Sequence, residues 1–140
     1  MTADEIHRRI KYLEGQINAL QRKNTTLKRN IADLEDGGAE ASTLASKWKK
    51  ALSDCFDAVR DKLSSVNTES GFKSHYLESI DAIFSSKEAN EISERLGSIK
   101  SDTRRKVNEF EDEIDSNNAK INRYQAEIDE LRAIQANGVE

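Results

Sequence analysis

The chain has 140 residues, of which 36% are apolar and 34% are charged, and it carries a net charge of -4 and no proline. So few apolar residues cannot fill a thick globular core, and nothing except a few glycines interrupts long helices. The composition therefore predicts an elongated all-α protein.

The sequence lacks the features of a membrane or secretory protein. No apolar run approaches the roughly 20 residues that span a bilayer, and residues 1–9 contain no apolar signal stretch. The single Cys55 excludes an internal disulfide and is compatible with a reducing compartment. We expect no membrane span and a cytoplasmic location. Export together with a partner, by a route without a cleaved signal peptide, stays open.

Residues 4–35 carry a heptad repeat, in which apolar residues recur at alternating spacings of four and three. Its members are Ile6, Ile10, Leu13, Ile17, Leu20, Leu27, Ile31 and Leu34, with Asn24 as the one polar member. This narrow seam predicts a helical arm that needs a helical partner. The Asp36-Gly37-Gly38 segment is expected to break or bend the helix.

Residues 104–135 carry a second repeat of matching length. Its members are Val107, Phe110, Ile114, Ile121, Tyr124, Ile128 and Leu131, again with one Asn, Asn117. If the arms pair antiparallel with Leu34 facing Val107, Asn24 faces Asn117. A slipped register leaves each amide against an aliphatic residue, which costs about 1–3 kcal/mol per buried unpaired group. The sequence therefore predicts an intramolecular antiparallel coiled coil whose register depends on Asn24 and Asn117.

Charge favours the same pairing of the two arms. Residues 1–34 hold seven basic and four acidic side chains, net +3, while residues 107–135 hold three basic and eight acidic ones, net -5. The arms therefore attract each other, with Lys28 expected opposite Glu111 and Glu35 opposite Arg104. Each exposed pair contributes only a few tenths of a kcal/mol, so these pairs select a partner more than they stabilise it. A homodimer is the alternative arrangement.

The segment 40–100 is expected to form a head of three short helices within a single domain, 1–140. Apolar residues from Leu44 to Val66 recur at three and four, which predicts a helix ending near residues 67–71. A second helix carries Tyr76 and Phe84. Ser85 and Glu88 have capping-box spacing, so a third helix should begin there and continue into the second arm.

The sequence offers little for catalysis, cofactor binding or metal binding. His7 and His75 lie in different parts of the chain, and nothing in their spacing indicates that either approaches Cys55. The acidic run 109–115 lacks the loop glycine of a calcium site. The basic residues 47–50 and 104–106 lie near acidic ones, which argues against a nucleic-acid surface. We expect a protein that is not an enzyme, has no cofactor or metal, and binds no nucleic acid.

Bulky residues in the head are the candidates for partner binding. They are Trp48, Phe56 and Phe84. A lone Trp on an amphipathic helix packs in the core more often than it contacts a partner, and both roles stay open for Trp48.

One segment of the head carries a family resemblance. Ser46-Lys47-Trp48-Lys49-Lys50-Ala51 is followed by Phe56, eight residues after the Trp. This resembles the WXG-type proteins of bacterial type VII secretion, particularly the longer helical proteins that accompany LXG toxins. The chain departs from the family at Lys50, where the family has Gly, and Tyr124 is followed by Ile128 instead of the acidic residue of the export signal.

The resemblance implies a function in secretion. It implies that this chain binds the helical N-terminal region of a larger toxin and acts as its targeting factor or chaperone. The alternative is a coiled-coil scaffold or adaptor subunit unrelated to secretion.

Overall fold

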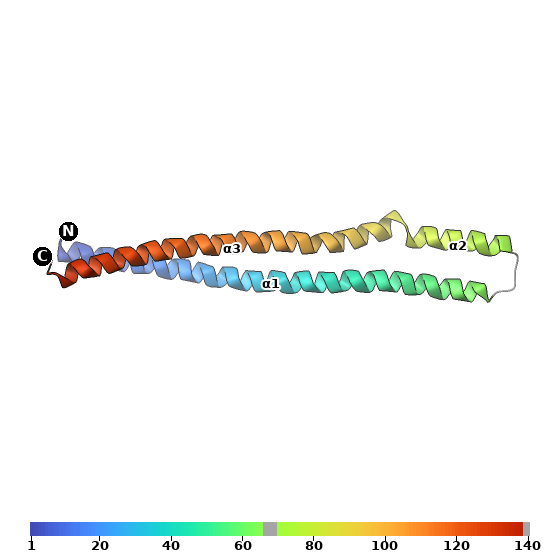
Figure 1. Ribbon diagram of the computed structural model, residues 1–140, viewed down its shortest axis with the longest axis horizontal. Coiled ribbons are helices and arrows are strands. Elements are labelled where there is room, and N and C mark those ends of the chain that lie inside the picture. The colour runs from blue at the N-terminus through green and yellow to red at the C-terminus, as the bar shows by residue number, and fades with distance from the viewer. Residues whose placement is uncertain (66–69, 139–140) are drawn as a thin grey trace. The chain divides into compact units, whose positions relative to one another are not determined.

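The computed structural model describes residues 1–65 and 70–138, and over these residues it contains three helices and no strand (Figure 1). The helices are α1 (Ala3–Ser64), α2 (Ser70–Phe84) and α3 (Lys87–Ala136). Helices α1 and α3 pack antiparallel, which confirms the prediction of an all-α helical hairpin.

The chain divides into two compact units. The arm unit consists of Met1–Leu34 and Arg105–Glu140, and the head unit consists of Glu35–Arg104. Each unit contains part of α1 and part of α3. That the whole chain forms a single domain stays a prediction.

Local hydrogen bonds explain where α1 and α3 begin. The amide of Glu5 donates to Oγ1 of Thr2 at 3.2 Å, and the amide of Thr2 donates to Oε2 of Glu5 at 2.8 Å, a reciprocal capping box. The expected cap of α3 at Ser85 is wrong by one residue, because the amide of Ala89 donates to Oγ of Ser86 at 3.3 Å. Helix α3 does continue from there into the second arm, as predicted.

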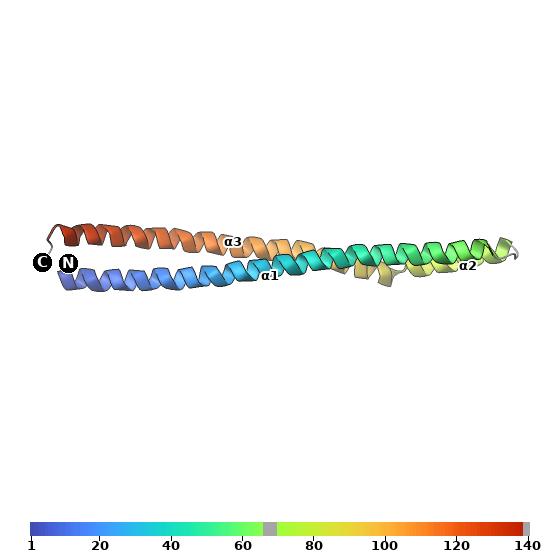
Figure 2. The ribbon, with the colours of Figure 1, turned by 90° about the horizontal axis from the view of Figure 1, so that it is seen from below.

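The arm unit is an antiparallel pair of helices with a buried apolar seam (Figures 1 and 2). The core cluster lies toward the chain termini, and Ile121 and Tyr124 pack against it. Leu27 and Val107 are also buried. Removing these side chains from water stabilises the pair by about 25 cal/mol per Å². The cluster consists of Ile6, Ile10, Leu13, Ile17, Ile128 and Leu131.

The expected helix break at Gly37-Gly38 is wrong, since α1 continues through both glycines to Ser64. A glycine inside a helix costs about 1 kcal/mol relative to Ala, which packing readily offsets. Gly38 is buried, and a Cβ at this position would lie 3.1 Å from Cγ2 of Thr103 on α3. Gly38 therefore permits a close approach of the two helices in the head unit.

The head unit is also a helical hairpin. Its described residues form three helical segments as expected, except that the first is the continuation of α1 instead of a separate short helix. The second part of α1 lies beside α2 and the beginning of α3, as contacts of Gly38 with Thr103 and of Phe56 with Phe84 show. Helix α1 ends at Ser64, and the expected end near residues 67–71 lies partly outside the described residues. Among the described residues of this unit, Ala89 is the one buried apolar side chain.

Candidate partner-binding surface

Three asparagines form a chain of hydrogen bonds in the seam of the arm unit. Nδ2 of Asn117 donates to Oδ1 of Asn24 at 2.9 Å, and Nδ2 of Asn24 donates to Oδ1 of Asn118 at 2.9 Å. Asn24 is 7% exposed and Asn117 is 6% exposed. The two residues thus face each other as the predicted register requires. Asn118 was not predicted, because it lies one residue beyond the seam.

Two ion pairs join the helices of the arm unit. Arg9 donates from Nε and Nη2 to the two carboxylate oxygens of Glu127 at 2.9 and 3.2 Å, and Nη2 of Arg132 lies 2.8 Å from Oε1 of Glu14. The hydrogen bond from Arg9 lowers the pKa of Glu127, and the same bond raises the pKa of Arg9. All four side chains are partly exposed, so these pairs contribute more to pairing specificity than to stability.

The expected ion pairs Lys28–Glu111 and Glu35–Arg104 do not form between these described residues. Lys28 follows Glu14 by two heptads, and Asn118 precedes Arg132 by two heptads. Because Glu14 pairs with Arg132, Lys28 faces Asn118 instead of Glu111.

The ion pairs also define the two flanks of an antiparallel helix pair. Arg9 directly precedes buried Ile10, and its partner Glu127 directly precedes buried Ile128. In the other pair, Glu14 and Arg132 each directly follow a buried leucine. Residues that directly precede buried seam residues in the sequence therefore lie on one flank of the helix pair, and residues that directly follow them lie on the other flank. This follows from helix geometry and holds for any antiparallel pair.

Trp48, a predicted partner-binding residue, lies half-buried between the helices of the head unit. Its indole Nε1 donates to the backbone carbonyl of Ala89 at 3.5 Å. Because Ala89 is small, the indole of α1 can lie close to the backbone of α3. Trp48 thus joins α1 to α3 in the head unit, and an additional contact with a partner stays a prediction.

Phe56 and Phe84, the other two predicted residues, contact each other. Their ring centroids are 5.9 Å apart in an edge-to-face arrangement, and the guanidinium of Arg60 lies 5.7 Å from the Phe56 centroid. Both rings are half-buried between α1 and α2. The structure therefore brings Phe56 and Phe84 together between α1 and α2, whereas Trp48 lies between α1 and α3.

Other large apolar side chains of the head unit are exposed. Phe72 and Tyr76 on α2 are 52% and 44% exposed, and their rings lie 5.9 Å apart. Ile83 follows one heptad later and is 66% exposed. Ile92 and Ile99 on α3 are also separated by one heptad. The full set consists of Leu44, Phe72, Tyr76, Ile83, Ile92 and Ile99.

These side chains lie on one flank of the head unit, which we call the apolar flank. Leu44, Tyr76 and Ile83 directly precede the half-buried residues Ala45, Leu77 and Phe84. The rule illustrated by Arg9 and Glu127 then places them on one side of the hairpin. Phe72 lies beside Tyr76, whose ring it contacts. Ile92 directly precedes half-buried Ser93, and Ile99 lies one heptad after Ile92. The opposite flank is polar. Its residues, each directly after an inward position, include Ser46, Lys49, Ser53, Asp57, Arg60, Glu78, Asp81, Asn90 and Glu94.

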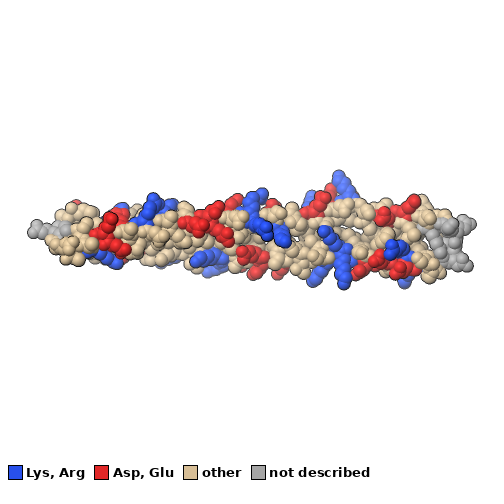
Figure 3. Space-filling view, in the orientation of Figure 1, with Lys and Arg blue, Asp and Glu red and all other residues tan. Residues whose placement is uncertain are grey.

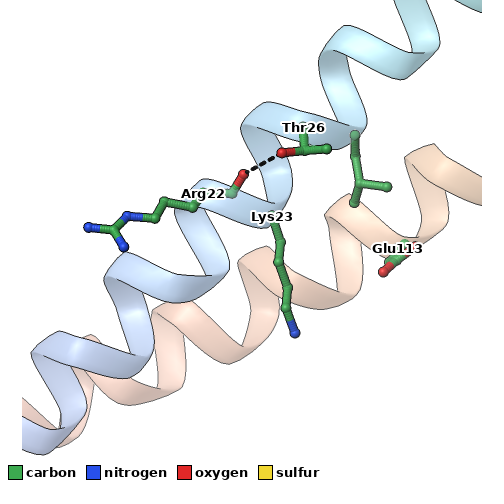
Figure 4. A pocket seen from close by; sticks show the side chains of 5 residues that line it. Arg22, Lys23, Thr26 and Glu113 are labelled. Carbon is green, nitrogen blue, oxygen red and sulfur yellow. Dashed lines mark hydrogen bonds between the residues drawn. The ribbon is translucent and has the colours of Figure 1, made fainter.

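The arm unit has no comparable apolar flank in its described part. Lys23 and Glu113 directly precede the inward residues Asn24 and Ile114, at positions equivalent to those of the apolar flank. Both border a hollow of about 410 Å³ that Arg22, Thr26 and Leu27 complete (Figure 4). Oγ1 of Thr26 donates to the backbone carbonyl of Arg22 at 3.3 Å. Charged residues thus border the seam here.

Side chains that could bind a metal ion lie scattered over the described residues. No group of three or more His, Cys, Asp or Glu side chains in residues 1–65 and 70–138 could hold a metal ion. Cys55 is exposed on α1, although its position beside Phe56 on the apolar face of the predicted helix favours a buried thiol. On the face drawn in Figure 3, basic and acidic side chains are interspersed. The described residues also contain no helix that is long and apolar enough to cross a membrane.

Comparison with known proteins gives no relative: no family model, no curated protein and no solved structure matches this chain.

Proposed function

We propose that this chain is a non-enzymatic helical protein that binds a larger helical protein through its head unit. Following the resemblance around Trp48, the proposed partner is the helical N-terminal region of an LXG-type toxin of type VII secretion, and the chain acts as its targeting factor or chaperone. In this proposal the complex forms in the cytoplasm and is exported without a cleaved signal peptide.

The observation that supports partner binding is the contrast between the two units. In the described residues, the arm unit buries eight apolar side chains, while the head unit buries Ala89 alone. The head unit instead leaves six large apolar side chains 42–66% exposed on one flank. Apolar surface of this extent on one side of a soluble helix pair is typical of an interaction site.

A scaffold subunit is the second candidate, because the closed seam of the arm unit suits a spacer between two other proteins. Gene neighbourhood separates the two candidates. An LXG-type toxin gene beside this one supports the first, and its absence favours the scaffold.

The direct test is co-expression of the full chain with the N-terminal region of the adjacent toxin, followed by pull-down. We expect capture by the wild-type chain and loss of capture by Tyr76→Ala/Ile83→Ala, which shortens two exposed side chains. A matched variant on the polar flank, Ser53→Ala/Asn90→Ala, should retain the toxin. Capture that survives the first variant, with circular dichroism showing intact helices, would remove the head unit as the binding surface.

Trp48→Ala/Phe56→Ala tests the residues predicted from sequence. Loss of capture together with a lower Tm would show that Trp48 and Phe56 act by holding α1 against α2 and α3. Loss of capture at an unchanged Tm would assign them a direct contact with the partner.

A further inference from the structure

We infer that the apolar flank receives one amphipathic helix of the partner, and that an acidic residue of this helix lies between Lys47 and Arg95. This inference rests on the proposed function and adds the chemistry of the partner's binding segment. The area of the flank, the shape of its two sides and the charges beside it support this inference.

The apolar flank is large enough to hold a helix. If a large side chain presents about 200 Å² when fully exposed, the exposed fractions leave roughly 600 Å² of the six residues in contact with water. A stable protein interface buries about 800 Å² on each partner, so the flank would supply most of one side. The helix pair of the head unit is therefore incomplete without a further helix.

The two sides of the flank differ in size. On α1, exposed Ala51, Cys55 and Ala58 directly precede the half-buried residues Leu52, Phe56 and Val59, so they lie on the same flank. On α2 and α3 the corresponding residues are large, such as Tyr76 and Ile83. An added helix can lie close to the small residues of α1 while the large side chains of α2 pack against its other side.

Charge selects the kind of helix. Lys47 precedes half-buried Trp48, and Arg95 precedes half-buried Leu96, so both border the apolar flank from opposite sides. Counting from Gly38, which lies against Thr103, places Lys47 and Arg95 within one residue of the same level. Neither forms an ion pair with a described residue. Lys47 also lines a hollow of about 460 Å³ beside Leu44, where a partner's side chain can enter.

Acidic residues lie one heptad away in each direction along the flank. Glu40 precedes half-buried Ala41 on α1, and Glu88 precedes buried Ala89 on α3. Along the flank, an acidic residue, a basic pair and a second acidic residue therefore follow one another at intervals of about 10 Å, at 1.5 Å per residue. A complementary helix carries a basic, an acidic and a basic residue at heptad spacing beside its apolar stripe.

The same charges argue against a second copy of this chain on the flank. A second copy lying parallel at the same level places Lys47 against Arg95 of the second copy, so that like charges meet without compensation. A separate helix with the complementary pattern has no such conflict.

Two synthetic four-heptad peptides test the inference with the full-length chain. Both have leucine at the core heptad positions. One carries Lys, Glu and Lys at successive flanking positions, and the other carries Glu, Lys and Glu. Fluorescence anisotropy should show at least tenfold tighter binding of the first peptide, and Ile83→Glu/Ile92→Glu should abolish binding of both. Lys47→Glu/Arg95→Glu should weaken or reverse the preference.

The matched control is Lys49→Glu/Arg104→Glu, which makes the same change of charge on the opposite flank and should leave the preference intact. Equal binding of the two peptides, or a preference that Lys47→Glu/Arg95→Glu does not change, overturns the inference. A dimer in sedimentation equilibrium that Ile83→Glu/Ile92→Glu dissociates would assign the flank to a second copy and overturn it as well. If the toxin is captured while any of these results is obtained, the inference fails and the proposed function holds. If the peptides show the expected charge preference but the toxin is not captured, only the identity of the partner is refuted.

Discussion

Asn24 uses its side-chain oxygen and its side-chain nitrogen within the seam of the arm unit, since it accepts from Asn117 and donates to Asn118. Asn24→Leu should therefore destabilise the protein by about 1–3 kcal/mol, because the buried amide of Asn117 loses its partner. Asn24→Leu/Asn117→Leu should raise the Tm above that of the wild type while loosening register or oligomeric state. Thermal melts followed by circular dichroism, with sedimentation for the oligomeric state, measure both effects. A double variant less stable than either single variant contradicts this account.

The ion pair of Arg9 and Glu127 makes stability depend on pH. Because Arg9 lowers the pKa of Glu127 in the folded chain, the stabilisation is present above the unfolded pKa of about 4.3 and is lost as the pH falls through the lower folded pKa. The Tm of the wild type should fall between about pH 5 and pH 3 by more than that of Glu127→Gln. Glu130→Gln, which replaces an exposed carboxyl elsewhere on α3, is the control and should follow the wild type. Identical pH profiles for wild type and Glu127→Gln would remove the pair from the stability of the arm unit.

At the scale of the helices, adjacent Gly37 and Gly38 form a matched pair. A Cβ at Gly37 meets nothing within 4 Å, so Gly37→Ala should stabilise α1 by about 1 kcal/mol. Gly38→Ala should give a smaller gain in stability or a loss, because its Cβ would lie 3.1 Å from Cγ2 of Thr103. Gly38→Ala/Thr103→Ser removes that methyl group and should recover the gain. Denaturant unfolding of the three variants measures these differences, and equal gains for Gly37→Ala and Gly38→Ala would mean that the helices do not approach closely there.

These glycines also show what the sequence does and does not predict about the elements. The heptads predicted the arms, the antiparallel pairing and the facing of Asn24 and Asn117, because buried seam positions repeat along the helix. The break at Gly37-Gly38 was predicted wrongly, since local propensity does not include the tertiary contact with Thr103. For the same reason the first helix of the head was expected to be a separate helix, whereas it is the continuation of α1 to Ser64. The second and third helices were predicted correctly and are α2 and the beginning of α3.

For the whole molecule, the candidate site was harder to predict than the fold. The choice of Trp48, Phe56 and Phe84 rested on residue size, and the structure places all three half-buried between helices. The exposed residues lie one position earlier in the sequence than these half-buried ones, since Ile83 precedes Phe84 and Cys55 precedes Phe56. Sequence periodicity alone does not tell which of two adjacent apolar stripes faces inward. The packing of α1 against α2 and α3 decides it.

Whether the arms pair within one chain is tested by a disulfide across the seam. In the register defined by Asn24 and Asn117, stepping four residues along each helix brings Leu20 opposite Ile121, and both are half-buried. In a Cys55→Ala background, Leu20→Cys/Ile121→Cys should oxidise to a species that migrates as a monomer under denaturing conditions. Leu20→Cys/Ile114→Cys, displaced by one heptad, should oxidise much more slowly, because the Cα atoms would be too far apart for a disulfide. Oxidation of the first variant only to dimers would show that the arms pair between chains, as in a homodimer, and the closed arm unit would then belong to two copies.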